Sequence, residues 1–170
     1  MTMTNKEHMR AALRMHTIPW LRELGFTGSY PHFRREQEDC IDLLSFQTNS
    51  YGGSFTVEVS AVFPGHPESN RLHWDGEPEE LNVFSTNHRH RLPGMYNGWF
   101  HYQDIYRRRI LFHTEYLAVP ERETARFVPA KGFRLFRKFD AAQEAQVCLE
   151  VNRQLQDAWI WLEEFRKSHR

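Results

Sequence analysis

The sequence predicts an α+β fold, a twisted antiparallel sheet of about five or six strands packed against an N-terminal helix and a long C-terminal helix. Apolar residues recur at helical spacing near both ends of the chain, and three consecutive segments of strand composition lie between them. The chain has 170 residues, of which 40% are apolar. That size and composition favour a single globular domain spanning residues 1–170.

The N-terminal helix is expected over residues 5–24. Thr4 followed three residues later by Glu7 forms a capping box. Pro19 should kink or restart the helix, and Gly25 should end it. The apolar stripe of this helix begins with Met9, Leu13, His16 and Ile18.

An antiparallel meander should follow, within a mainly stranded region over residues 29–119. Its first strands are expected at Tyr30–Arg35, Asp39–Thr48 and Ser54–Phe63, separated by the turns EQED and NSYGG. Alternation in the third strand predicts one buried face and one largely polar face. The polar face carries Thr56, Glu58 and Ser60.

Residues 64–80 are rich in Pro and Gly and read as a surface loop. Further strands are expected near Leu92, at residues 98–102 and at 105–119, with a short hairpin within 127–139. A helix over residues 140–167 should end the fold, because Asp140 and Gln143 form a capping signature. Its apolar stripe is Ala141, Ala145, Cys148, Val151, Leu155, Trp159, Leu162 and Phe165.

Cysteine content and hydropathy predict a cytoplasmic protein. The only cysteines, Cys40 and Cys148, are expected to be buried and reduced. No apolar run approaches the roughly 18–20 residues that span a bilayer, and no secretory signal is recognisable at the start.

The formal net charge is zero, but the charges are unevenly distributed. Ten acidic residues and one basic residue lie in 36–80, whereas eleven basic and four acidic residues lie in 86–138. This asymmetry can attract a charged partner or nucleic acid. The favoured interpretation is that the two segments neutralise each other across neighbouring strands.

The motif PHFRR is the first candidate site. On a strand His32 and Arg34 share one face, while Phe33 and Arg35 share the other. An arginine beside an imidazole can hold a carboxylate or phosphate. The alternative is a structural ion pair of Arg34 or Arg35 with one of three acids, Glu36, Asp42 or Glu58.

The HRHR run and the aromatic segment after it provide further candidates. His88 and His90, with His101 or His113, could supply three nitrogens to zinc or another divalent metal. The spacing alone is weak, so no cofactor is predicted. Arg91, Trp99 and His101 are candidate binding residues with His32 and Arg34, although aromatic packing is the favoured interpretation of Trp99 and its neighbours.

Four segments together resemble the bacterial domain-of-unknown-function family numbered 4304, over about residues 5–105. They are LRELGFTGSYPHFRR, IDLLSFQTNSYGGSFTVEVS, RHRLPG and GWFHYQD. The C-terminal third carries no such resemblance. The family implies a fold and a motif pattern without an activity, and an association with gene neighbourhoods of small binding and immunity proteins.

Standard catalytic signatures are missing from the sequence, including the nucleophile elbow, the Walker loop, the dinucleotide fingerprint and HExxH. We therefore expect a non-catalytic binding or accessory protein, in one version immunity-type, that acts on a protein partner. The alternative is a metal-dependent hydrolase or nucleic-acid-processing enzyme built on His32, Arg34, His88, His90 and His101. The protein could be a monomer, or a homodimer formed through an edge strand or the Trp159–Trp161 end of the last helix.

Overall fold

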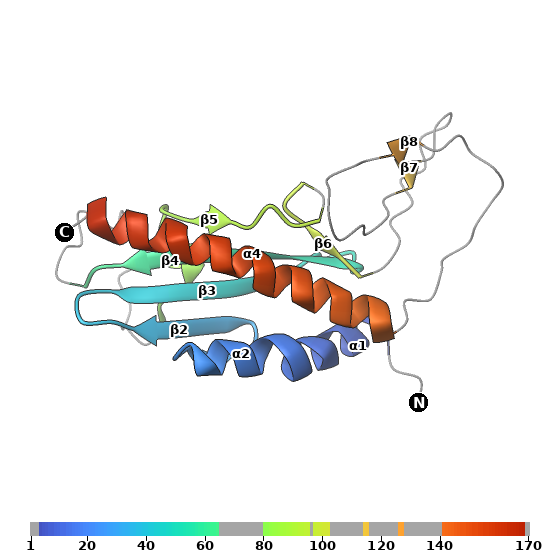
Figure 1. Ribbon diagram of the computed structural model, residues 1–170, viewed down its shortest axis with the longest axis horizontal. Coiled ribbons are helices and arrows are strands. Elements are labelled where there is room, and N and C mark those ends of the chain that lie inside the picture. Colours follow the sequence, from blue (N-terminus) through green and yellow to red (C-terminus); the bar gives the residue numbers. More distant parts are fainter. Residues whose placement is uncertain are drawn as a thin grey trace.

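In the computed structural model, helices cover one face of an antiparallel sheet (Figure 1). The structure describes residues 4–64, 80–95, 97–102, 114–115, 126–127 and 141–168. The helical elements are α1 (Asn5–Ala12), the π-helical η1 (Leu13–Thr17), α2 (Ile18–Glu23), the 3-10 turn η3 (Val83–Ser85) and α4 (Ala141–Ser168). The strands are β1 (Thr27–Ser29), β2 (His32–Glu36), β3 (Ile41–Thr48), β4 (Ser54–Val62), β5 (His90–Arg91), β6 (Phe100–His101), β7 (Thr114–Glu115) and β8 (Arg126–Phe127).

The N-terminal segment is helical from Asn5 to Glu23 and begins at the predicted capping box of Thr4 and Glu7. Its middle turn is a π-helix, in which the backbone N–H of Ile18 donates to the carbonyl of Leu13. The wider turn shifts the buried stripe by one position. Thr17 is therefore buried, and the expectation that His16 belongs to the stripe is wrong, because His16 is exposed.

The predicted meander is confirmed, with strand order β1-β2-β3-β4-β5 and β6 also paired to β4. Every pairing in this sheet is antiparallel. The sequence did not indicate β1, which is only three residues long and pairs with β2. The short β5 and β6 share one edge of β4, so the long strands β3 and β4 lie at the centre of the sheet.

The main core lies between the sheet and its helices. The apolar face of β4, Phe55, Val57, Val59 and Ala61, packs in one cluster with buried residues of α1, η1, α2 and α4. Of the predicted stripe of α4, Cys148, Val151, Leu155 and Leu162 are buried, whereas Ala145, Trp159 and Phe165 are half-buried. A smaller cluster of Ile41, Leu43, Val62 and Val83 lies on the opposite sheet face.

A buried ion-pair network fastens α4 to the sheet. The carboxylate of Asp42 on β3 is fully buried, and Arg35 of β2 donates to its Oδ2 from Nη2 at 2.7 Å and from Nε at 3.0 Å. Arg166 of α4 donates to both carboxylate oxygens at 2.9 Å. The guanidinium of Arg35 also lies 4.8 Å from the centre of the Phe26 ring. Arg35 of the PHFRR motif thus forms a structural ion pair with Asp42, which was the alternative to a binding site considered for this motif.

Several sequence expectations fall wholly or partly outside the described residues. The structure describes the 64–80 loop only at its two ends, the strand at 105–119 only at the two residues of β7, and the hairpin at 127–139 only at Phe127.

Cys40 and Cys148 are buried and form no disulfide, and burial raises the pKa of each thiol to about 11. Among the helices that the structure describes, none is long and apolar enough to cross a bilayer.

Candidate functional site

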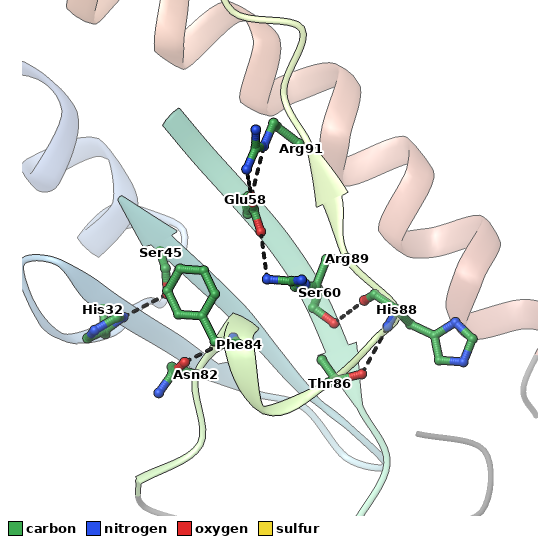
Figure 2. Close-up of polar contacts among 10 residues, drawn as sticks. All are labelled: His32, Ser45, Glu58, Ser60, Asn82, Phe84, Thr86, His88, Arg89 and Arg91. Atoms are coloured by element: carbon green, nitrogen blue, oxygen red, sulfur yellow. Dashed lines mark hydrogen bonds and ion pairs between the residues drawn. The ribbon is translucent and has the colours of Figure 1, made fainter. Parts of the chain in front are cut away.

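A row of four polar side chains crosses the sheet on the face turned away from the helices. The strand registers place His32 opposite Ser45, Ser45 opposite Glu58, and Glu58 opposite Arg91. Residues directly opposite on antiparallel strands share a sheet face, so the four side chains form one continuous line, which we call the polar row. Figure 2 shows this row with the segment that packs over it.

Glu58 is the centre of the polar row. Its side chain is only 5% exposed. Arg91 donates to Oε1 from Nη2 at 2.6 Å and from Nε at 2.8 Å, while Arg89 donates to Oε2 from Nη1 at 3.3 Å. The side chains of Arg89 and Arg91 remain 38% and 46% exposed. We call these three residues the Glu58 clamp, because a buried carboxylate fixes two guanidiniums at the protein surface.

The other end of the row is a histidine–serine pair. Nδ1 of His32 and the hydroxyl of Ser45 are 2.8 Å apart, and Ser45 is buried whereas His32 is exposed. Partial burial lowers the pKa of His32 below its ordinary value. The imidazole is therefore held mainly neutral near pH 7.

A short 3-10 turn places one aromatic ring over the row. Asn82 caps η3 by accepting from the backbone N–H of Phe84 at 2.9 Å, and Val83 anchors the turn in the smaller core. The Phe84 ring meets His32 edge-on at 6.3 Å between ring centres, and the guanidinium carbon of Arg89 lies 5.5 Å from the ring centre. Phe84 is 42% exposed. It thus lies between His32 and Arg89 (Figure 2), and its exposure leaves part of the ring in solvent.

A glycine-dependent turn positions Arg91. A Cβ on Gly98 would come within 2.9 Å of Cδ of Arg91, so the stem of the arginine lies directly against the glycine backbone. The same turn is fixed to α4 at Gly94, whose N–H donates to Oε1 of Gln154 at 2.8 Å while Nε2 of Gln154 donates back to its carbonyl at 2.9 Å. This buried amide pair holds the turn, and with it the Gly98 backbone on which Arg91 packs, against α4.

The structure brings some of the predicted site residues together and separates others. His32, Arg34, Arg91 and His101 lie on the same sheet face, since His101 pairs with Ser54 of β4. Arg34 donates to Glu36 at 3.2 Å, which is the structural alternative considered for it. Trp99 is half-buried, and among the residues that the structure describes its indole makes no contact with the polar row.

The family assignment follows from the comparison with known proteins. A family model described as a domain of unknown function (DUF4304) matches residues 17–164. The chain belongs to the DUF4304 family. The match extends well past residue 105 and includes most of α4, so the expectation that the C-terminal third lies outside the resemblance is wrong. No curated protein and no solved structure shows significant similarity.

In this DUF4304 domain the predicted histidine cluster is divided between two sides of the sheet. His90 stacks on Trp161 of α4 at 4.9 Å, and the His88 ring lies 5.4 Å from Phe165. His101 lies on the opposite face by its register with Ser54. Within the described part of the chain, no three metal-binding side chains gather into one group. His88, His90 and His101 therefore do not come together as the three-nitrogen metal site considered from the sequence. His113 lies outside the residues that the structure describes.

Sequence reasoning missed four residues of the candidate site: Ser45, Glu58, Phe84 and Arg89. Glu58 was considered only as an ion-pair partner, although it is the one charged residue in the apolar segment SFTVEVSAV. The β4 face expected to be largely polar is buried at Ser54, Thr56, Glu58 and Ser60. Phe84 had a weaker signal, the sequence Asn82–Ser85, which forms a capping box around the turn.

The polar row offers binding groups more readily than catalytic ones. Ser45 lies within a strand that is paired on both sides, so backbone N–H groups near its hydroxyl are used in the sheet and do not form an oxyanion hole. Glu58 accepts from two arginines, which makes it a poor general base for the His32–Ser45 pair. What stays accessible is a partly exposed ring flanked by guanidiniums and an imidazole.

The stacking of His90 on Trp161 predicts a loss of stability in mild acid. Partial burial lowers the pKa of His90 from its ordinary value of 6.5, so the folded protein binds fewer protons at this site than the unfolded chain. This contribution to stability is complete above that ordinary pKa and falls as the pH drops through it. Urea unfolding at several pH values should show a steeper loss below pH about 6.5 in the wild type than in His90→Phe. If the free energy of unfolding depended on pH in the same way in both proteins, His90 would not be the source of the loss.

Proposed function

We propose that this DUF4304 domain is a non-catalytic binding protein that recognises a protein partner with the sheet face opposite its helices. The observation that carries the proposal is the partly exposed Phe84 ring held between His32 and Arg89 above the polar row. Aromatic and arginine side chains in a fixed arrangement are the groups that contribute most to protein interfaces.

The composition of this face supports recognition of a partner over chemistry. The charged groups of the polar row are already engaged with one another, and Ser45 and Glu58 are buried beneath the exposed side chains. The arginines of such a surface are already held in place, so they lose little conformational entropy when a partner binds. An immunity-type role, in which the protein occludes a harmful partner, is one form of this function. The hydrolase alternative gains no support, because the histidines on which it depends lie on two sides of the sheet.

Site-specific photocrosslinking in the source organism tests the proposal. A benzoylphenylalanine replacing Phe84 is a small structural change, and the matched control is the same residue at Ile160, which is 60% exposed on α4. The partner should give a discrete adduct at position 84 and none at position 160. If both positions give the same adducts, or only position 160 reacts, this sheet face is not the binding surface.

A further inference from the structure

We infer that the Glu58 clamp recognises carboxylates, so that the partner contributes an acidic segment to the interface. This inference rests on the proposed function and adds the chemistry of the partner to it. Arginine forms strong, charge-assisted hydrogen bonds with carboxylates, and the clamp already holds one carboxylate: Nε and Nη2 of Arg91 both donate to Oε1 of Glu58.

Arg89 has donors to spare. Its Nη1 donates to Glu58 at 3.3 Å, and in the described part of the chain its Nε and Nη2 make no hydrogen bond. The guanidinium carbon of Arg89 lies over the Phe84 ring, 5.5 Å from its centre, and this cation–π contact restricts the rotation of the side chain. Arg89 is therefore oriented before binding and can donate to a second carboxylate from its open edge.

The charge balance of the clamp favours an anion. Two guanidiniums face one carboxylate, which leaves one unit of positive charge at the surface. Arg34, on the same sheet face, is balanced by Glu36. An incoming carboxylate would offset the remaining charge, whereas a lysine or arginine of a partner would be repelled.

An acidic protein segment suits this surface better than a nucleic acid. Nucleic-acid grooves follow the backbone with many cations and stack successive bases on several rings. Here the clamp has two arginines, and Phe84 is the single exposed aromatic ring described over the polar row. In a peptide, an aliphatic or aromatic residue can pack on Phe84 while a neighbouring Asp or Glu binds the arginines of the clamp.

Glu58 competes with the partner for the same arginines. Replacing it with glutamine keeps the shape and an acceptor oxygen but removes the negative charge. The Glu58→Gln variant should therefore bind acidic peptide more tightly, by severalfold. Arg89→Met should bind it about tenfold more weakly, since it loses one charge-assisted pair of about 1.4 kcal/mol.

The test uses a fluorescein-labelled ten-residue polyglutamate peptide and anisotropy at low salt, with polyglutamine and a ten-residue oligothymidylate as parallel probes. The matched control is Arg153→Met, which removes an exposed arginine of α4 that also pairs with carboxylates. Circular dichroism confirms that each variant is folded. We expect polyglutamate alone to bind, weaker binding in Arg89→Met, tighter binding in Glu58→Gln, and no change in Arg153→Met.

Three results would overturn the inference: no binding of polyglutamate to the wild type, equal effects of Arg89→Met and Arg153→Met, or preferential binding of oligothymidylate. Each is distinguishable from failure of the proposed function. A discrete photocrosslink at position 84 together with no response to polyglutamate would retain the binding face and reject the acidic partner.

Discussion

Replacing Asp42 with alanine is expected to destabilise the fold by about 3–5 kcal/mol, because it leaves two arginines without their common buried carboxylate. Asp42 is fully buried, and the side chains of Arg35 and Arg166 are only 18% and 16% exposed. Neither guanidinium can regain full hydration without moving its strand or helix. The expected effect is a large fraction of the stability of a typical domain.

Urea unfolding followed by tryptophan fluorescence and circular dichroism measures this effect. The matched control is Asp157→Ala, which breaks an exposed ion pair with Arg153 on α4 and should cost less than about 0.5 kcal/mol. Asp42→Asn should fall between the two, since the amide retains an acceptor for one arginine. A loss in Asp42→Ala no larger than in the control would show that this network does not fasten α4 to the sheet.

Gly94→Ala should have the second large effect, about 3 kcal/mol, and should also disturb the candidate site. Gly94 has a φ of +69°, and an added Cβ would lie 2.4 Å from the backbone nitrogen of Trp99. Because that nitrogen belongs to the backbone of the same turn, the collision cannot be relieved by rotating a side chain. The turn must shift, which disrupts its amide pair with Gln154 and the packing that positions Arg91.

Gly52→Ala provides the control for backbone strain alone. Gly52 also has a positive φ, of +78°, but an added Cβ would meet nothing within 4 Å. It should cost about 1–2 kcal/mol, so the difference between the two variants isolates the collision at the turn. Thermal unfolding measures both variants. Equal losses would mean that the turn adapts to the extra carbon.

The fold class could be predicted because its signals are local in the sequence. The helical stripe of Cys148, Val151, Leu155 and Leu162 and the alternation of β4 both describe neighbouring residues. The same period of two correctly separated His32 and Arg34 from Phe33 and Arg35. The π-helical turn at Leu13–Thr17 could not be foreseen in this way, since it breaks the regular period.

The candidate site could be predicted only in part, because its contacts are long-range. Arg91 meets Glu58 across 33 positions of sequence, and only the pairing of β4 with β5 brings them together. Phe84 comes from a segment without strand or helix periodicity, and its position depends on the cap at Asn82. The histidine spacing gave the right shared direction for His88 and His90, but α4 occupies that side with Trp161 and Phe165.

The most direct test of the proposed binding face is the yield of partner adduct with the photocrosslinker at Phe84 relative to that at Ile160. Both positions expose an apolar side chain, one above the polar row and one on the outer side of α4. A binding face opposite the helices predicts a discrete adduct at position 84 and background at position 160. A ratio near one, or a higher yield at position 160, would contradict it.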